Sequence, residues 1–355
     1  MIGNMKWGIL SYSTAAPASD TFSLWGWGAN NYSQIGDGTT TQSLTPTPVG
    51  SSTWKFIGTG IKNITCHAIL DADDTLWGWG RNTYGQIGDG GNTHRTAPVQ
   101  IGSCTWKIVS EGYYYTHALR SDDTLWGWGS NNFGQIGDGT TTTRKSPTQI
   151  GSSTWADVSN GDYTVAGILS DGTLWTWGQN YTSAPSQISA STTYKKCTVG
   201  DTIIHLIAND DTLWGMGEKV FVGDGSTTGL YAAPTQIGTS TWKMVSDYLT
   251  GGHAILSDDT LWGWGGNING EIGDGTSSIK YSLVQIGSCT WKFVAHGGGH
   301  TLAIRGDDTY WAWGKNSSGE LGDGTTTQRL SPVQIGSSTW SYASGMASSS
   351  HGGLL

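Results

Sequence analysis

One five-residue phrase recurs seven times along this 355-residue chain. Four copies read LWGWG, and the other three read LWTWG, LWGMG and YWAWG. They begin at Leu24, Leu76, Leu125, Leu174, Leu213, Leu261 and Tyr310, so successive copies are 52, 49, 49, 39, 48 and 49 residues apart. A nearly fixed period of this size indicates an array of small units, none of which can bury its apolar face alone.

Each period reads as four short β-strands. In one unit the expected strands are TWKIVS from Thr105, THALRS from Thr116, TLWGWG from Thr124 and a stretch that ends at Gly151. Clusters of Gly, Asp, Asn and Ser separate them, and no segment has a sustained helical stripe. Because radial repetition leaves only short, protected sheet edges, we expect an all-β fold, a seven-bladed β-propeller of four-stranded blades.

The two ends of the repeat array complement each other. Residues 21–28 supply an LWGWG strand with no strands of the unit before it, whereas Ser338 to Leu355 supply the two strands that are missing. We therefore expect one composite blade of N- and C-terminal strands to close the ring, with residues 21–355 as the propeller. Residues 1–20 form an N-terminal extension, and its Trp7 is a candidate anchor on a neighbouring subunit. This extension has no signal-peptide or membrane-spanning pattern, which favours cytoplasmic synthesis without membrane insertion.

Tryptophan is concentrated in the repeated phrase. Of 20 Trp, 13 lie in its seven copies, where they alternate with glycine along the strand. Side chains on alternate residues share one face, so we expect the glycine face of one blade to receive the indoles of the next. The predicted structural core between blades is Trp25, Trp27, Trp77, Trp79, Trp126, Trp128, Trp175, Trp177, Trp214, Trp262, Trp264, Trp311 and Trp313.

Leu125 to Gly139, LWGWGSNNFGQIGDG, is followed by a P-x-x-I strand, a hydrophobic strand and a HAIL-type strand. This order resembles the regulator of chromosome condensation repeat, a family of seven-bladed propellers, over roughly residues 21–355. The resemblance implies the fold. Family members serve as exchange factors, ligase partners, scaffolds and bacterial or phage surface or virion components, so it implies no single function. The exchange-factor members carry an inserted wedge, and the repeat spacings here leave no room for one.

Composition and motifs exclude several functions. Charged residues make up only 13% of the chain, the net charge is −9, and no basic run exceeds two residues, so nucleic acid is not an expected partner. No GxSxG, HExxH or phosphate-binding loop occurs, and we expect neither an enzyme nor a cofactor. The four cysteines have no CxxC spacing, and no metal site is expected. We expect six histidines to share one repeat position with a structural role: His67, His117, His205, His253, His300 and His351.

Strand parity divides the loops between two faces. In a four-stranded blade the first and third turns emerge together, and these turns differ from unit to unit. The second turn, SDDT, and the GSST link emerge on the other face as a repetitive acidic ring. Because aromatic residues are enriched in binding surfaces, the variable face is the candidate for recognition. Its candidate binding residues are Tyr113, Tyr114, Tyr115, Tyr163, Tyr231 and Tyr248.

These observations favour a non-enzymatic structural or recognition propeller. Low charge and Gly, Thr and Ser-rich turns resemble phage structural proteins, so the expected setting is a virion or an extracellular microbial surface, as a decoration, fibre or attachment protein. The expected partners are other protein subunits, those of a virion included, or a surface glycan. Two alternatives stay open: a carbohydrate-binding lectin with sites between blades, and an intracellular scaffold or exchange factor of the chromosome condensation regulator type.

Overall fold

The computed structural model describes residues 21–58, 60, 64–188 and 191–354. They form β-strands and one short 3-10 helix, η1 (Lys219–Phe221), with no α-helix in these ranges. The strands are β1 (Phe22–Gly28), β2 (Ser43–Ile57), β3 (Thr65–Leu70), β4 (Thr75–Gly80), β5 (Arg95–Glu111), β6 (Tyr115–Arg120), β7 (Thr124–Gly129), β8 (Arg144–Asn160), β9 (Thr164–Leu169), β10 (Leu174–Gly178), β11 (Ser186–Gln187), β12 (Tyr194–Val199), β13 (Ile203–Ala208), β14 (Thr212–Glu218), β15 (Leu230–Tyr248), β16 (Gly251–Leu256), β17 (Thr260–Gly265), β18 (Lys280–His296), β19 (His300–Arg305), β20 (Thr309–Gly314), β21 (Arg329–Gly345) and β22 (Ser349–Leu354).

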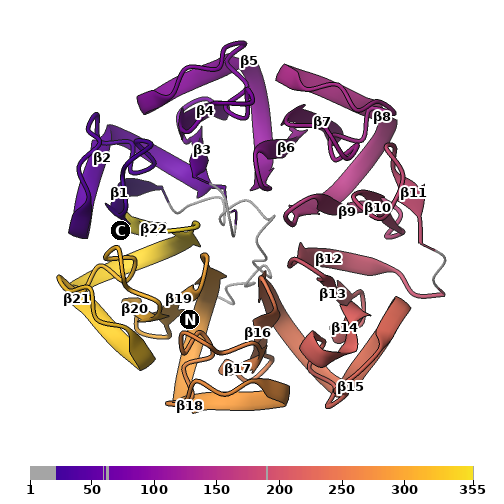
Figure 1. Ribbon diagram of the computed structural model, residues 1–355, viewed down its shortest axis with the longest axis vertical. Coiled ribbons are helices and arrows are strands. Elements are labelled where there is room, and N and C mark those ends of the chain that lie inside the picture. Colours follow the sequence, from indigo (N-terminus) through magenta and orange to yellow (C-terminus); the bar gives the residue numbers. More distant parts are fainter. Residues whose placement is uncertain (1–20, 59, 61–63, 189–190, 355) are drawn as a thin grey trace, which may run out of the picture.

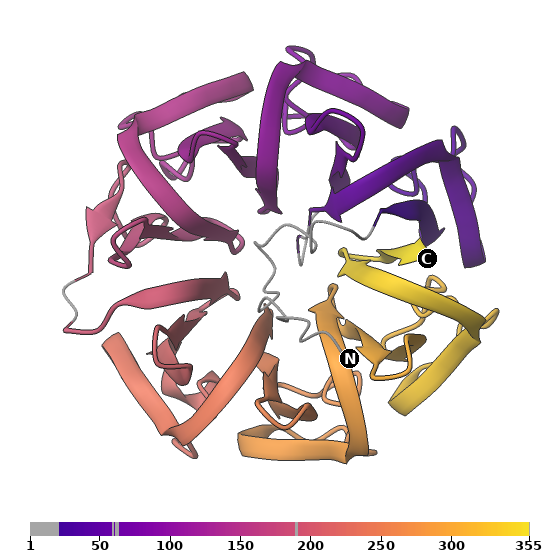
Figure 2. The same cartoon turned by 180° about the vertical axis from the view of Figure 1, so that it is seen from behind.

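The strands build a ring of seven antiparallel blades, as the sequence predicts (Figure 1). Long strands link neighbouring blades: the first part of β5 pairs with β4 in one blade, and its last part pairs with β6 in the next. A glycine in the left-handed region bends such a strand, as Gly102 does at φ 64°. Both views of the ring show the last part of each long strand running toward the centre (Figures 1 and 2).

The predicted composite blade is confirmed. Strand β1 pairs on one side with β22, from Ser23 opposite Leu354 to Gly28 opposite Ser349, and on the other side with β2. Strand β22 pairs in turn with the last part of β21. The C-terminal strands therefore lie against the N-terminal one with no covalent link between them (Figure 1).

The unit with the 39-residue spacing keeps its blade. Strand β9 pairs with the last part of β8 and with β10, and β10 pairs in turn with β11. The fourth strand, β11, has only two residues, Ser186 and Gln187. The loop that other units carry between their third and fourth strands is replaced by residues 179–185. The fold thus shortens this unit at a loop and at an outer strand without losing a blade.

Aliphatic side chains of one blade pack against indoles of the next. One such cluster joins Ile69, Leu76 and Ile87 to Trp106 and Trp128 of the following blade. In the six phrases that have a second Trp, this Trp is fully buried in these clusters, whereas the first Trp of all seven is only partly buried at their edge. The fully buried indoles of the phrase are Trp27, Trp79, Trp128, Trp177, Trp264 and Trp313.

The expectation that the motif's glycine face receives these indoles is wrong. A Cβ built on Gly78 would lie 2.8 Å from the His67 ring, which belongs to the same blade. The neighbour's indole instead meets a glycine of the GDG turn: a Cβ on Gly137 would lie 2.7 Å from Nε1 of Trp177. The alternating glycine of the motif therefore makes room within the blade, and the turn glycine makes room between blades.

Five of the six buried indoles also donate a hydrogen bond across the blade interface, whereas Trp264 packs against Gly223 and its Nε1 has no hydrogen-bond partner among the described residues. In these five the Nε1 bonds the backbone carbonyl of the Gln or Glu that precedes the GDG turn in the neighbouring blade. These bonds join Trp27 to Glu320 (2.9 Å), Trp79 to Gln34 (3.1 Å), Trp128 to Gln86 (2.9 Å), Trp177 to Gln135 (3.0 Å) and Trp313 to Glu271 (2.7 Å). A loop and an indole thus form one repeated joint around the ring.

The irregular unit changes both halves of this joint. Its blade lacks the GQIGDG loop, and the next blade has Met216 where the other blades have a buried Trp. Met216 is 3% exposed and packs with Tyr194, Ile204 and Leu206. A flexible thioether side chain fills an irregular gap well. The missing loop and the missing indole therefore compensate for each other across one interface.

Replacing Gly137 with alanine should destabilise the ring far more than replacing Gly139 two residues later. Both glycines have positive φ, 84° and 80°, so each substitution costs about 1 to 2 kcal/mol of backbone strain. Only the Gly137 methyl meets an indole, which adds roughly 1 to 3 kcal/mol of overpacking, because nothing lies within 4 Å of the Gly139 position. Urea unfolding of Gly137→Ala and Gly139→Ala measures the difference, and equal midpoints would contradict the proposed joint.

Candidate functional site

The repetitive face is less acidic than its sequence indicates. The first Asp of each SDDT turn caps the turn, as Asp122 accepts from Thr124 N (3.1 Å) and Oγ1 (2.6 Å). The second Asp, in the left-handed region, pairs with the Lys that follows the Trp of the STW strand, or Tyr194 in one unit. These pairs are Lys55 with Asp74, Lys107 with Asp123, Lys195 with Asp211, Lys243 with Asp259 and Lys292 with Asp308. Lysines far from the turns in sequence therefore offset about half of these carboxylates.

The GDG aspartates are likewise engaged in their own loops. Asp138 accepts from Oγ1 of Thr140 (2.7 Å) and pairs with Arg144 (2.6 Å). Comparable pairs join Asp89 to Arg95 and Asp323 to Arg329. Within the described ranges no three His, Cys, Asp or Glu side chains are arranged to hold a metal ion.

The repeated histidine position is an inter-blade contact. His67 reaches Glu111 of the next blade (2.8 Å) and His205 reaches Asp247 (2.7 Å). Burial disfavours charge on His205, but Asp247 outweighs it and raises the pKa of the imidazole. These side chains are fully buried, so they hold blades together and present nothing to a ligand.

His300 does not belong to this set. It pairs with Gly314, whereas His67 pairs with Gly78, so Leu302, opposite Ala312, occupies the histidine position of that blade. The expectation of six equivalent histidines is therefore wrong by one. The two blades without this histidine are those with Ala312 or Thr176 in place of the motif's central glycine. A side chain is tolerated there because no imidazole fills the space.

Two of the candidate tyrosines are structural. Tyr115 is 0% exposed and donates its hydroxyl hydrogen bond to the Gly161 carbonyl (2.9 Å) of the next blade. Tyr248 is 2% exposed and donates to the Trp264 carbonyl (2.9 Å). Burial raises the pKa of both phenols well above their usual range. The prediction that they lie on a binding surface is wrong, because both side chains are buried inside the ring, Tyr115 at the start of β6 and Tyr248 at the end of β15.

Tyr231 lies partly buried at another blade. Its hydroxyl donates to the Asp224 carboxylate (2.6 Å), and the Lys219 ammonium lies 4.3 Å from its ring centroid. No described ring contact joins it to the other candidate tyrosines. Tyr231 is thus a local brace of the loop that contains η1.

The first and third turns do meet on one face. The residue after each LWGWG phrase donates its N–H to the first turn, as Ser130 donates to Tyr114 O (2.8 Å) and Gln179 donates to Tyr163 O (2.9 Å). Rings from the two kinds of turn touch as well: Tyr84 lies 5.0 Å from Tyr114 between ring centroids. The variable turns therefore form one continuous surface, the variable face.

Three candidate tyrosines join a larger cluster on this face. Tyr113 and Tyr114 have centroids 3.9 Å apart, and Tyr163 lies 5.7 Å from Tyr113 and 4.8 Å from Phe133. The Arg81 guanidinium links this group to a further ring of the composite blade. We call this cluster the aromatic sector; it comprises Tyr32, Arg81, Tyr84, Tyr113, Tyr114, Phe133 and Tyr163.

Sequence reasoning missed the most exposed members of the sector. Tyr32, Tyr84 and Phe133 are 37%, 38% and 47% exposed, and each is two residues before the Gln of its GQIG-type loop. Two later units have Asn269 and Ser318 at this place. The aromatic residues therefore occur in three consecutive blades, and comparing units position by position would have found them.

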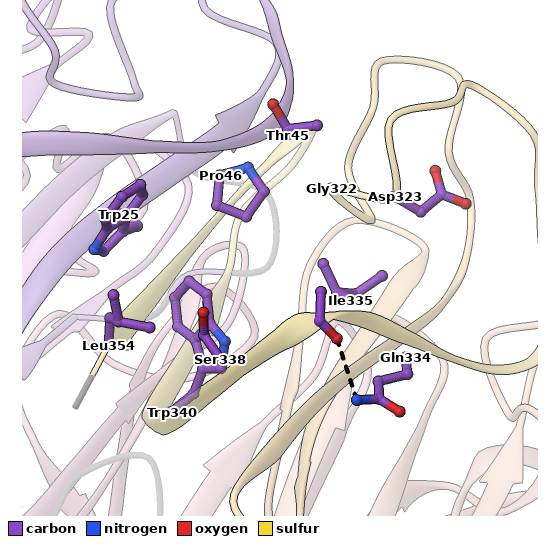
Figure 3. Close-up of a pocket in the computed structure, with 11 residues that line it drawn as sticks. Trp25, Thr45, Pro46, Gly322, Asp323, Gln334, Ile335, Ser338, Trp340 and Leu354 are labelled. Atoms are coloured by element: carbon purple, nitrogen blue, oxygen red, sulfur yellow. Dashed lines mark hydrogen bonds between the residues drawn. The ribbon is translucent and has the colours of Figure 1, made fainter.

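A cavity of about 370 Å³ lies between the last blade and the composite blade (Figure 3). Trp25, Trp340, Pro46 and Leu354 form its apolar side, and Asp323, Gln334 and Ser338 line the rest. Other blades do not repeat it unchanged. Arg120 takes the place of Leu354 in one blade, and its guanidinium lies 4.0 Å from the centroid of Trp126. These two interfaces therefore do not carry identical pockets, the feature that would favour a lectin.

A ring of four-stranded blades built on one tandem repeat defines a β-propeller whose loops are free to diverge. Residues 23–67, 73–119, 122–168 and 307–350 match the family model of the regulator of chromosome condensation (RCC1) repeat, and residues 107–135 match a second model of it. These segments make up about half of the chain, which therefore belongs to the RCC1 repeat family.

Solved structures show the same fold. Prp20p from Saccharomyces cerevisiae has a TM-score of 0.85 at 14% identity, over 97% of this chain and 93% of Prp20p. Human WBSCR16 has a TM-score of 0.83 at 15% identity, over 94% of this chain and 99% of WBSCR16. Identities this low establish the architecture and no shared activity. In the described residues no helix is long and apolar enough to cross a membrane.

Proposed function

We propose that this chain is a structural or recognition propeller that binds a partner protein through its variable face. The observation that carries this proposal is the aromatic sector, a cluster of partly exposed rings at loops that differ between units. Exposed aromatic groups of this kind are enriched in protein interfaces. The opposite face repeats one turn, and its second aspartates are paired with lysines. Prp20p, which shares the fold, is described with binding to Gsp1p and histones, and another of its structures contains Kap60.

Several finer predictions rest on composition alone. Placement in a virion or on a microbial surface, as a decoration, fibre or attachment protein, is part of our proposal, supported by the low charge and the Gly, Thr and Ser-rich turns. A scaffold of the chromosome condensation regulator type would use the same face. The proposed anchor, Trp7, lies outside the described residues.

The variant Y113S/Y114S/Y163S should lose partner binding by at least about tenfold, because truncating aromatic anchors typically removes more than 1 kcal/mol each. Its fold should persist, because these rings are partly buried and another unit has AHGGG, residues 295–299, in the equivalent turn. The Tm and the partner affinity of the variant are compared with those of the wild-type chain. Hydroxyl-radical footprinting of the wild-type chain, alone and in its native assembly, locates the contact. We expect protection at Tyr84 and Phe133.

Y115F is the matched control, since it removes a buried hydroxyl and leaves the surface rings in place. It should lower stability by about 1 kcal/mol, the usual cost of a lost hydrogen bond, without weakening binding. Protection confined to the SDDT turns, with binding lost on reversing the charges of Asp122 and Asp123, would show that the opposite face is the working one.

A further inference from the structure

Arg81 is held in an unusual place for an arginine of this face. It follows β4, and its guanidinium carbon lies 4.8 Å from the Tyr32 ring centroid and 4.7 Å from that of Tyr114. Its Nε donates to Thr83 Oγ1 (3.1 Å) and its Nη1 donates to the Tyr114 hydroxyl (3.0 Å). The side chain is therefore fixed between two rings from different blades.

No carboxylate among the described residues forms an ion pair with Arg81. By contrast, Arg95, Arg144 and Arg329 on this face each bind the aspartate of a GDG turn. A guanidinium has five N–H donors, and hydrogen bonds to Thr83 and Tyr114 use only two of them. Arg81 is partly exposed, so its remaining donors can reach a bound molecule.

The surroundings of Arg81 favour an anion beside apolar groups. Lys145 lies against Gly85, next to Tyr84, and its Nζ bonds the neutral Asn92 side chain (3.2 Å). Burial and the nearby Arg81 lower the pKa of His94, whose ring lies 5.6 Å from Tyr32. At the end of the sector away from Arg81, the backbone carbonyl of Asp162 accepts a hydrogen bond from Tyr113 N (3.3 Å). The lowered pKa favours a neutral His94, so Arg81 is the cation of this end of the sector, in a chain with a net charge of −9.

We infer that the aromatic sector recognises a partner-protein segment in which a carboxylate is flanked by apolar side chains. The carboxylate binds Arg81 in the forked geometry that guanidinium offers, and the apolar side chains cover Tyr84 and Phe133. The Tyr32 and Tyr114 rings hold the Arg81 guanidinium in place before the partner binds, so little side-chain entropy is lost on binding. This inference rests on the proposed use of the variable face and adds the chemistry of the partner.

The test selects binders from a random dodecapeptide library displayed on mRNA, with the full chain immobilised. We expect enrichment of Asp or Glu next to aromatic or aliphatic residues. Arg81→Met should weaken the best selected peptide by about tenfold or more, as expected for a charge-assisted hydrogen bond. Changing the peptide's Asp to Asn should cost the wild-type chain a similar factor and cost Arg81→Met little, as a double-mutant cycle requires.

Two further variants separate the outcomes. Lys292→Gln removes a positive charge from the opposite face and should leave binding unchanged, and Arg81→Lys keeps the charge but should recover only part of the affinity. If the selected peptides lack carboxylates and do not bind Y113S/Y114S/Y163S, the role of Arg81 is overturned and the proposed function stands. A selection that yields no peptide dependent on the sector would overturn both. Binding of an acidic oligosaccharide in place of peptides would assign the sector to a glycan.

Discussion

A chain without residues 338–355 is expected to lose its cooperative thermal transition. The deletion removes β22 and the part of β21 that pairs with it, so β1 loses a full antiparallel partner. It also exposes Trp27, which is fully buried and is 6.0 Å from Trp340 between ring centroids. An open ring with an unpaired strand edge and bare indoles has no cooperative native state. Differential scanning calorimetry of the truncated and full chains measures the loss.

A synthetic peptide of residues 338–355 is the control for this deletion. Because the C-terminal strands meet β1 without a covalent link, the peptide added in trans should restore the transition in a concentration-dependent way. A melting curve unchanged by the deletion would refute a closed ring that depends on the composite blade.

Acidification from pH 6.5 toward pH 4 is expected to unfold the chain. Burial lowers the pKa of four histidines from 6.5 to about 4, and these are His117, His253, His300 and His351. Above pH 6.5 they are neutral in both states and contribute no pH dependence. Below it the unfolded chain binds protons that the folded chain refuses, so stability falls as pH falls through this window. Each contributes on the order of 3 kcal/mol, and four together rival a typical domain stability of about 5 to 15 kcal/mol.

Other buried groups modify this profile. The pKa of His296 is lowered by burial and by His253 and acts in the same direction. Burial raises the pKa values of Asp157 and Glu271, which offsets part of the loss. His205 has a raised pKa beside Asp247, so it adds stability as the pH falls toward 6.5 and is protonated in both states well below that. Urea unfolding between pH 7.5 and 4.5 measures the slope, which His117→Gln should reduce and His205→Gln should not. Stability that is flat across this range would contradict the prediction.

The period of the sequence was sufficient to predict the ring and its closure. Seven copies of one phrase fix the number of blades, and the missing half-unit at each end requires the composite blade. Both inferences depend on counting units along the chain. Neither depends on which way a side chain points.

Side-chain direction is where sequence reasoning failed. Tyr113, Tyr114 and Tyr115 are adjacent and chemically identical, but Tyr114 has a φ of 71°, and the chain then enters β6 with Tyr115 turned inward. A left-handed residue in a turn is not visible as a pattern. Aligning the units by their histidines places His300 two residues away from its structural position. The residue equivalent to the other histidines is Leu302.

Contacts between units were also beyond the reach of the pattern. The aromatic sector depends on a third turn of one unit meeting the first turn of the next, as Tyr84 meets Tyr114. Comparing units with one another shows which positions differ. It does not show which of the differing positions become neighbours in space.

The interface between Met216 and the preceding blade, which lacks the GQIGDG loop, has a consequence for how such rings can evolve. A single repeat cannot be inserted, removed or exchanged freely, because its loop must suit the side chain that the following blade brings. Selection would therefore act on the boundary between two repeats. The heritable module of this propeller is the interface, which begins in the middle of one unit and ends in the middle of the next.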